Sequence, residues 1–389
     1  MMGVRRMEIA MKKVIHMISS MNMGGAETMV KDYALLMDKT QFDTMIISLD
    51  KRYHSVNEKY LQDAGIPVIY LSELRYPAEK ELNIFQKIIR RIARYYDLWK
   101  IIKKEKPDIL HVHLYIGNYL KLIPVKKWGI KLLYTVHNVP ERFFDPLGKN
   151  KEKYFAYKEI KRLLKKEDLT LISLHDDMNQ ELRKIFSTDR VITVNNGINL
   201  DRFHKELYNR TEIRKHLGIK KDAFVIGHVG RFHEQKNHEL LIKIFHGLLK
   251  RKANAHLLLI GEGPLREQAN EQIRSLGLEK YVTILQNRND IPELMSIMDS
   301  FVFPSRWEGF GNVLIEAQSM ELPCIVSDKI SQSAIVNCNV LVLSLDTEVE
   351  KWVDAILYQT KAEPSEDLQK YNMRSSVKKL ERIYTDKEN

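Results

Sequence analysis

Short apolar runs alternate with longer amphipathic stretches from one end of the chain to the other. Runs such as 14–18 and 169–173 have the length of buried strands. Stretches such as 85–106 carry apolar residues at roughly the 3.6-residue spacing that is typical of helices. This alternation predicts an α/β protein whose parallel sheets are covered by helices on both faces.

The alternation runs through two series. The predicted strands of the first series are 14–18, 44–49, 67–71, 107–113, 131–138, 169–173 and 190–195. Those of the second are 224–230, 256–260, 282–285, 300–304 and 323–327, with a weaker stretch near 340–345. The predicted helices are 28–37, 55–64, 85–106, 211–217, 238–251, 265–276, 291–298, one that opens near 311, 349–360 and 368–384. Polar residues at 201–221 separate the series, so we expect domains at 1–200 and 201–367, and a C-terminal helical segment, 368–389, that can cross back to the first domain.

Length and composition agree with two globular domains. At about 100–200 residues per domain, 389 residues predict two, and 44% apolar residues allow each its own core. The cysteines, Cys324 and Cys338, lack metal-ligand spacing and favour a reducing compartment. No apolar run reaches the ~18 residues of a transmembrane helix. Residues 1–11 read as an irregular leader in which Met11 is an alternative start.

The net charge of +11 belongs entirely to the first half of the chain. Residues 1–200 hold 35 Lys and Arg against 24 Asp and Glu, and the remainder is neutral. This asymmetry suggests nucleic acid, acidic lipid headgroups or a phosphorylated substrate as a partner, or simply solubilising charge. Helix 85–106 carries Arg90, Arg91, Arg94, Lys100, Lys103 and Lys104, and its apolar residues are Ile88, Ile89, Ile92, Leu98, Ile101 and Ile102. We expect the apolar residues to face the core and the basic face to be solvated, with a membrane-surface role as the alternative.

The most informative stretch is 305–317, Ser-Arg-Trp-Glu-Gly-Phe-Gly-Asn-Val-Leu-Ile-Glu-Ala. It predicts a glycine-containing turn after a buried strand and then a helix. Glu308 lies in the turn, and Glu316 lies within the helix. A helix N-terminus offers free N–H groups and partial positive charge, which suit an anionic or hydroxyl-rich ligand. A loop glutamate and a helical glutamate paired with a lysine are the alternative.

Glycine, histidine and asparagine residues follow several predicted strands of the first half. Gly24 and Gly25 stand between a strand and a helix, where backbone N–H groups can approach a phosphate, although a tight turn without a ligand has the same pattern. His113, His137 and Asn196 also lie at strand ends. Because the carboxyl ends of parallel strands meet at one edge, these residues can converge there. A lone histidine such as His137 is, however, more often structural.

Two cations follow the first predicted strand of the second half. Arg231 can bind two oxygens and Lys236 can act as a point charge, which together suit a diphosphate; unliganded basic residues are the alternative. His111 and His113 form an H-x-H pair, but no third ligand stands at a useful spacing for zinc, and no Asp-x-Asp motif suggests magnesium. We therefore expect no obligatory metal, with Arg231 and Lys236 supplying positive charge.

These motifs together resemble one enzyme family over nearly the whole chain. They are Gly24-Gly25-Ala26-Glu27, Thr135-Val136-His137, Asn196-Gly197-Ile198-Asn199, Gly230-Arg231 with Lys236, Gly261-Glu262-Gly263-Pro264, and Glu308 with Glu316. The chain is similar to the retaining nucleotide-sugar glycosyltransferases of family four. It departs from them at 329–333, where many relatives carry a Gly-Gly pair and a Glu. The resemblance implies the GT-B fold, which is two Rossmann-like domains facing across a cleft, and no cofactor beyond the nucleotide-sugar co-substrate.

The resemblance implies how the donor would bind. Glu316 would hold the ribose hydroxyls, and the backbone near Asn287 and Arg288 would meet the base. Sugar hydroxyls and phosphate would meet the N–H groups of Phe310, Gly311, Asn312 and Val313. From the first domain, Gly24 and Gly25 would approach the same phosphates.

The resemblance also implies the catalytic groups. Glu308 would lie near the transferred sugar, and His137 would face both the sugar and the acceptor. Arg231 and Lys236 would stabilise the leaving diphosphate. The acceptor would attack from the face of the leaving group, whose phosphate oxygen helps remove the acceptor proton. His113 and Asn196 are weaker candidates on the acceptor side.

The expected reaction moves a hexose or N-acetylhexosamine, most often from a UDP-sugar, to a saccharide or lipid-diphosphate saccharide in capsule or exopolysaccharide synthesis. The enzyme would be cytoplasmic, with its basic half at an anionic membrane surface. One alternative is a nucleotide-sugar epimerase of the same fold, against which the paired-glutamate spacing argues. Another is a nucleic-acid-binding protein, but Tyr95, Tyr96 and Trp99 are clustered rather than laid out as a stacking platform. We expect no nucleic-acid partner.

Overall fold

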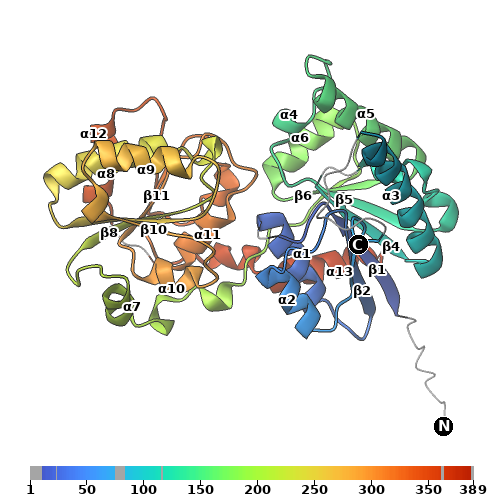
Figure 1. Cartoon of the computed structure of the whole chain (residues 1–389), viewed down its shortest axis with the longest axis horizontal. Helices are drawn as coiled ribbons and strands as arrows, with labels where there is room; N and C mark the ends of the chain where they lie inside the picture. The colour runs from blue at the N-terminus through green and yellow to red at the C-terminus, as the bar shows by residue number, and fades with distance from the viewer. Residues whose placement is uncertain (1–10, 23, 75–83, 115–116, 361–362, 387–389) are drawn as a thin grey trace, which may run out of the picture. The chain divides into compact units, whose positions relative to one another are not determined.

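The computed structural model describes residues 11–22, 24–74, 84–114, 117–360 and 363–386. The chain forms two compact units, each with its own parallel sheet (Figure 1). Unit 1 contains the chain up to Asn195 and from Arg374 onward, and unit 2 contains Asn196–Met373. The two α/β domains with parallel sheets that the alternating pattern predicts are confirmed, as is the Rossmann-like architecture that the resemblance implies.

The sheet of unit 1 has the strand order β3-β2-β1-β4-β5-β6-β7, and every neighbouring pair is parallel. Its strands are β1 (Lys12–Ile18), β2 (Phe42–Ser48), β3 (Val68–Tyr70), β4 (Ile109–His113), β5 (Lys131–Thr135), β6 (Thr170–Ser173) and β7 (Val191–Thr193). Its helices are α1 (Gly25–Leu36), α2 (Val56–Asp63), α3 (Ile84–Glu105), α4 (Pro140–Phe143), α5 (Lys151–Lys166), α6 (Asp176–Phe186) and α13 (Met373–Tyr384). All five residues of β4 are buried, as expected for a central strand covered on both faces.

The sheet of unit 2 has the order β10-β9-β8-β11-β12-β13 and is also entirely parallel. Its strands are β8 (Phe224–Val229), β9 (Ala255–Ile260), β10 (Val282–Leu285), β11 (Ser300–Phe303), β12 (Cys324–Ser327) and β13 (Val340–Leu343). Its helices are α7 (Arg210–His216), α8 (His238–Arg251), α9 (Arg266–Ser275), α10 (Ile291–Ser296), α11 (Asn312–Ser319) and α12 (Val349–Tyr358). Helices α8, α9 and α12 pack on one face, and α10 and α11 pack on the other, so two apolar layers enclose the sheet (Figure 1).

The helix expected at 368–384 is interrupted. A short 3₁₀ turn covers Glu366–Tyr371, Asn372 is extended, and α13 begins at Met373. The break arises because the backbone of Ile198 pairs with this segment, donating to Tyr371 O at 2.8 Å and accepting from Met373 N at 2.8 Å. After the break, α13 packs on unit 1, where Lys12 Nζ donates to Tyr384 O at 3.0 Å.

Helix α3 corrects one expectation. Leu98 and Ile102 are buried, but Ile89 and Ile92 are 52% and 63% exposed. At 100° per residue, the two pairs lie about 130° apart around the helix, so one face cannot bury both. The side chains of Arg90 and Arg91 lie outside the described residues. Among the helices that are described, none is both long and apolar enough to cross a membrane. Cys324 is buried, Cys338 is exposed, and both are free thiols.

Candidate active site

Unit 2 has a topological switch point between β8 and β11. The chain builds β9 and β10 on one side of β8 and then returns to build β11, β12 and β13 on the other. In open parallel sheets, ligands bind at the carboxyl ends of the strands beside such a point. The loops that follow β8 and β11 span residues 230–237 and 304–311, and they contain Arg231, Lys236, Glu308, Phe310 and Gly311.

An ion pair joins these two loops. Lys236 Nζ lies 2.7 Å from Glu308 Oε1, and Gln235 Nε2 donates to Glu308 Oε2 at 3.1 Å. The side chains of Lys236 and Glu308 are only 14% and 6% exposed, and the ammonium lies 4.6 Å from the centre of the Phe303 ring. Both oxygens of the predicted catalytic glutamate are therefore occupied, one of them by the lysine predicted to bind diphosphate.

Helix α11 begins at the same edge of the sheet. Its N-cap is Gly311, whose φ of 91° is left-handed and favours glycine. The Phe310 ring is buried, 5.0 Å from the Tyr371 ring. Asn312 and Val313 are half-buried in the first turn of α11. Their position agrees with the predicted binding role of this helix N-terminus.

Asn196, predicted to lie on the acceptor side, is found in unit 2. It is the first residue of unit 2, and its Nδ2 donates to Asn312 Oδ1 at 2.6 Å. It therefore supports the start of α11 and belongs with the predicted donor motif, not with the first domain. No local pattern indicates this pairing, because 116 residues separate the two asparagines.

Glu316 differs from Glu308 in having no partner among the described residues. It is half-buried in α11, and within the described chain no hydrogen bond or ion pair engages its carboxyl group. Burial raises its pKa to about 7, against the opposing influence of Arg202 and Lys236. A half-buried carboxyl group without a protein partner is suited to accept hydrogen bonds from ligand hydroxyls.

Arg231 is exposed beside a tightly packed loop. The described residues form no ion pair with it, so its guanidinium is available to an anion. The loop after β9 lies against its backbone: a Cβ at Gly261 would collide with the carbonyl oxygen of Gly230, and one at Gly263 would collide with that of Phe232. The Gly-Glu-Gly-Pro motif thus allows two neighbouring strand-end loops to touch.

Asn287 and Arg288 follow β10. Asn287 is exposed with φ 49°, and Arg288 forms an ion pair with Asp290. The guanidinium of Arg288 is thus engaged within the protein, while the predicted role of this backbone in base binding stays a prediction.

At the carboxyl edge of unit 1, Gly24 caps α1 and Gly25 is exposed, with no atom within 4 Å of a built Cβ. A carboxylate shares this helix N-terminus: Glu27 Oε2 occupies the place where a Cβ on Gly24 would stand, and Ser20 Oγ donates to Oε1 at 3.0 Å. Burial raises the pKa of Glu27. A phosphate approaching Gly24 would therefore meet an acidic group, Glu27, to which the sequence analysis assigned no role.

Histidines line the neighbouring strands of unit 1. His137 follows β5 and is half-buried, and its Nε2 lies 3.2 Å from Nδ1 of His113. His113 is fully buried, so it corrects the second acceptor-side expectation: it cannot touch an acceptor directly. Burial lowers the pKa of His137 to about 3 and that of His113 well below its ordinary value.

The expectation that no third ligand joins His111 and His113 was wrong. His16, on β1, stands opposite His111 of β4, and ligand atoms of His16, His111 and His113 lie within 4.8 Å of one another. The third ring, His16, lies on a different strand and is brought close by the register between β1 and β4. Residue spacing within one strand cannot reveal it. These rings are already hydrogen-bonded: His16 Nδ1 to His113 Nε2 at 3.0 Å, and His111 to Tyr384 Oη and Thr135 Oγ1 at 2.6 and 2.7 Å. A bound metal would have to replace these bonds.

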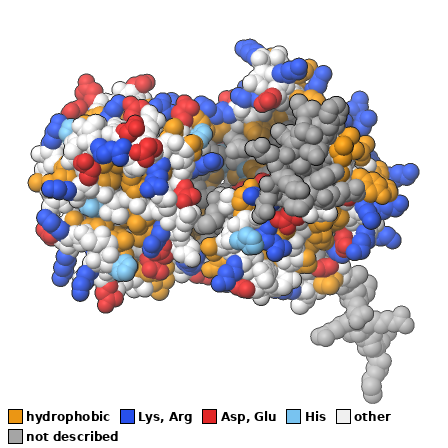
Figure 2. Space-filling view, in the orientation of Figure 1, with side chains coloured by type: hydrophobic (Ala, Val, Ile, Leu, Met, Phe, Trp, Pro, Cys, Tyr) orange, Lys and Arg blue, Asp and Glu red, His pale blue; other side chains and the backbone are white. Residues whose placement is uncertain are grey.

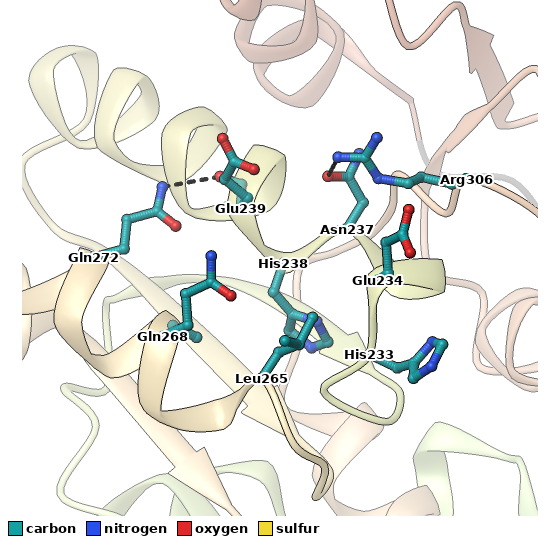
Figure 3. Close-up of a pocket in the computed structure, with 10 residues that line it drawn as sticks. His233, Glu234, Asn237, His238, Glu239, Leu265, Gln268, Gln272 and Arg306 are labelled. Atoms are coloured by element: carbon teal, nitrogen blue, oxygen red, sulfur yellow. Dashed lines mark hydrogen bonds between the residues drawn. The ribbon is translucent and has the colours of Figure 1, made fainter.

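Unit 2 also holds a cavity of about 180 Å³ between the starts of α8 and α9 (Figure 3). His238 lines it, stacked on Phe232 with the ring centres 4.1 Å apart. Arg306 reaches it from the loop after β11, and its Nη2 donates to Asn237 Oδ1 at 3.3 Å. No residue predicted to bind the donor lines this cavity, although His233, Glu234 and Arg306 belong to the same two loops, those after β8 and β11.

Comparison with known proteins agrees with this arrangement. Residues 23–202 match the model described as Glycosyltransferase Family 4, and residues 209–376 match that of Glycosyl transferases group 1. The putative glycosyltransferase EpsF of Bacillus subtilis is 29% identical over 90% of this chain and 88% of its own length. An Escherichia coli UDP-Gal:alpha-D-GlcNAc-diphosphoundecaprenol alpha-1,3-galactosyltransferase is 30% identical over 62% of this chain and 63% of its own.

Solved structures show the same fold. The chain superposes on Anabaena Alr3699/HepE, solved in complex with UDP-glucose, with a TM-score of 0.70 at 19% identity, covering 96% of this chain and 95% of that one. The two matched models together span both units, and the switch-point residues of unit 2 lie within the second. The chain is therefore a glycosyltransferase of family four, the group 1 glycosyltransferases, with the GT-B fold.

Proposed function

We propose that this glycosyltransferase moves a hexose or N-acetylhexosamine from a UDP-sugar to a saccharide carried on a lipid diphosphate, with retention of anomeric configuration. The product would extend a cell-surface polysaccharide such as capsule or exopolysaccharide. The named E. coli relative, which uses UDP-Gal and a diphosphoundecaprenol acceptor, supports this choice of substrates.

The observation that carries the proposal is the contrast between the two glutamates of the 305–317 motif. Glu316 is half-buried and unpartnered among the described residues, at the edge where α11 begins. A ribose diol offers two hydroxyl donors, which an ionised carboxylate accepts. Glu316 would therefore anchor the nucleotide, while the backbone at Asn287 and Arg288 meets the base.

The chemistry would take place near Glu308. The N–H groups at the start of α11 would bind the donor's sugar and phosphate, and Arg231 and Lys236 would stabilise charge on the departing diphosphate. The carboxylate of Glu308 already binds Lys236 and Gln235, which favours a positioning role near the sugar over covalent attack. A phosphate oxygen of the leaving group would then assist removal of the acceptor proton, on the same face. His137 would face the sugar and the acceptor.

We further propose that no metal is obligatory. Of the two carboxylates in the 305–317 motif, Glu308 is ion-paired with Lys236, and Glu316 has a pKa raised to about 7 by burial. A Mg²⁺–diphosphate complex is commonly held by one or two ionised carboxylates. The positive charge would instead come from Arg231, Lys236 and the helix N-terminus.

The acceptor would reach unit 1 from an anionic membrane surface. Helix α3 exposes Ile89, Ile92 and Tyr96 along one face, and Lys103 lies over the Trp99 ring at 4.6 Å. Exposed apolar side chains with lysines beside them are typical of helices that lie in a lipid interface. In Figure 2, apolar and basic side chains lie together over the part of unit 1 where Figure 1 shows α3.

The donor assignment is tested by thermal shift and turnover with UDP-, GDP- and ADP-sugars. We expect UDP-sugars to stabilise the wild type, and Glu316→Gln to weaken nucleotide binding about 10- to 100-fold, since hydrogen bonds to a charged group contribute about 1.5–3 kcal/mol. Glu271→Gln, an exposed substitution on α9, is the matched control and should bind normally. Equal affinity of Glu316→Gln and wild type would remove the donor assignment.

The membrane assignment needs its own test. Flotation with vesicles containing phosphatidylglycerol should recover the wild type, and Ile89→Ser/Ile92→Ser should reduce recovery several-fold. Equal recovery with neutral phosphatidylcholine vesicles would remove the electrostatic part of this proposal.

A further inference from the structure

A row of hydrogen-bonded imidazoles runs from the rim of unit 1 into its core. His137 Nε2 lies 3.2 Å from His113 Nδ1, and His113 Nε2 lies 3.0 Å from His16 Nδ1. His137 is half-buried, whereas His113 and His16 are fully buried. The second ring nitrogen of His16, Nε2, is buried and has no hydrogen-bond partner among the described residues. The row therefore ends inside the protein.

All three rings are neutral at physiological pH. Burial lowers the pKa of His16 and His137 to about 3, and that of His113 is lowered further by the neighbouring rings. A neutral imidazole has one N–H donor and one acceptor nitrogen. The position of the proton on any one ring consequently fixes it on the other two, because each contact needs one donor and one acceptor.

Only two arrangements satisfy both contacts. In the first, every ring is protonated at Nε2, and His16 then buries an N–H group with no acceptor. In the second, every ring is protonated at Nδ1, and His16 buries only an unshared lone pair. Orphaned buried N–H groups are the rarer fault in proteins, and leaving one unsatisfied costs about 1–3 kcal/mol. The inner end of the row thus favours protonation at Nδ1.

We propose that His16 and His113 are positioning residues that hold His137 as its Nδ1–H tautomer, so that His137 donates a hydrogen bond from the carboxyl edge of unit 1 and does not act as a base. This inference rests on the proposed function, in which His137 faces the sugar and acceptor. A fixed N–H donor suits an oxygen that gains negative charge during transfer. It also leaves removal of the acceptor proton to the leaving phosphate.

His111 does not share this row. Its two ring nitrogens contact Tyr384 Oη and Thr135 Oγ1, and because a hydroxyl group can donate or accept, either tautomer of His111 is satisfied without the row. Its closeness to His113, with ring centres 4.2 Å apart, is a packing contact.

The direct test is the tautomer of each histidine in the full chain, read by long-range ¹H–¹⁵N correlation after ¹⁵N-histidine labelling. Two rings calibrate the spectrum. His175 Nδ1 accepts from Met178 N at 3.3 Å and must carry its proton on Nε2, and His228 Nδ1 faces Val302 O at 2.9 Å and must carry its proton there. We expect His16, His113 and His137 to resemble His228. Unstructured histidines favour Nε2–H, so an Nε2–H signal from any of the three would overturn the proposal.

Two substitutions at His113 separate positioning from packing. The side-chain amide that His113→Asn introduces stands near the former Nδ1 and can still donate to His137, whereas the side chain of His113→Leu cannot. We expect His113→Leu to return His137 to the Nε2–H form and to lower kcat about 10- to 100-fold with little change in KM for the donor. This loss is smaller than the roughly 10²- to 10³-fold typical of removing an oriented donor outright, because the ring of His137 itself remains. His113→Asn should keep the Nδ1–H form and most of kcat.

The tautomer measurement needs no substrate, so the two proposals can fail separately. An Nδ1–H signal in a protein that turns over no nucleotide-sugar would remove the proposed function and leave the tautomer assignment standing. Turnover together with an Nε2–H signal at His137 would remove the tautomer assignment and leave the proposed function standing. If His113→Leu does not fold, the wild-type spectrum still decides.

Discussion

The carboxyl edges of the two sheets have similar topology and opposite electrostatics. Unit 1 includes the half of the sequence that carries the whole net charge, yet its edge presents neutral imidazoles and the carboxyl group of Glu27. The second half of the sequence is neutral in sum, yet the edge of unit 2 presents Arg231 and the Lys236–Glu308 pair. Net charge therefore does not predict where the cations gather at strand ends, and it is these cations that support the proposed phosphate-binding edge.

The largest expected effect comes from breaking the Lys236–Glu308 pair. Lys236→Met leaves Glu308 charged and nearly buried, so the free energy of unfolding should fall by about 3–5 kcal/mol. Activity should fall about 10²- to 10³-fold because one cation is lost from the proposed leaving-group site. Urea denaturation and turnover measure the two effects.

The double variant Lys236→Met/Glu308→Leu is the control for this prediction. Removal of both charges should recover most of the stability and none of the activity. If the single and double variants were equally unstable, the pair would not be the cause of the loss.

The next effect concerns the contact between the loops after β8 and β9. Gly261→Ala should cost about 2–4 kcal/mol, since its Cβ would meet the Gly230 carbonyl and the residue has a φ of 154°. Gly277→Ala also has positive φ but meets no atom within 4 Å, so it should cost only about 1 kcal/mol. Thermal unfolding of both variants separates crowding from backbone strain; equal shifts would contradict the close packing.

A smaller effect depends on pH. The folded pKa of Glu316, about 7, exceeds the ordinary value of 4.5, so the folded state binds more protons than the unfolded state between these values. Stability should therefore decrease as pH rises through this window. Glu316→Gln should be more stable than the wild type at pH 8, by about 1–2 kcal/mol after allowance for solvent contact, and nearly equal at pH 4.

Calorimetry at both pH values checks this prediction. The same titration should weaken nucleotide binding by the wild type as pH falls below about 7, because the carboxylate is the form that accepts two hydroxyl groups. Glu316→Gln should bind with little pH dependence. If the difference in stability between the wild type and Glu316→Gln did not vary with pH, the pKa of Glu316 would not be raised in the folded state.

The smallest expected effect concerns Gly25, at the carboxyl edge of unit 1. Gly25→Ala has room for its Cβ at the first position of α1 and should stabilise the protein by about 0.5–1 kcal/mol. If Gly25 approaches the donor phosphates, the same change should raise KM for the nucleotide-sugar several-fold. An unchanged KM would assign phosphate binding to unit 2 alone.

Periodicity predicted the sheet strands and the order of elements well, because parallel strands buried on both faces have a strong local signal. It failed where a residue's environment depends on distant chain segments. The exposed Ile89 and Ile92 fit a helical pattern but lie on a different face from Leu98 and Ile102. The break at Asn372 requires Ile198, which no local rule identifies.

The candidate site was predicted as a set of residues and not as a set of contacts. Residue type and strand-end position were enough to select Glu308, Glu316 and Lys236. The pairing of Glu308 with Lys236 and the third histidine, His16, depend on which strands become neighbours. Strand order is set by packing across the whole sheet, so these contacts appear only in three dimensions.

The return of the chain to unit 1 has a consequence for biosynthesis. Unit 2 is inserted between residues 195 and 374, and the last helix, α13, supplies Tyr384 to His111 and a carbonyl to Lys12. During translation, the face of the first sheet that carries His16 and His111 therefore stays uncovered until α13 has been synthesised, after all of unit 2. Unit 2 can complete its own contiguous segment while that face is still open, so the domain that begins the sequence is the one that finishes folding last.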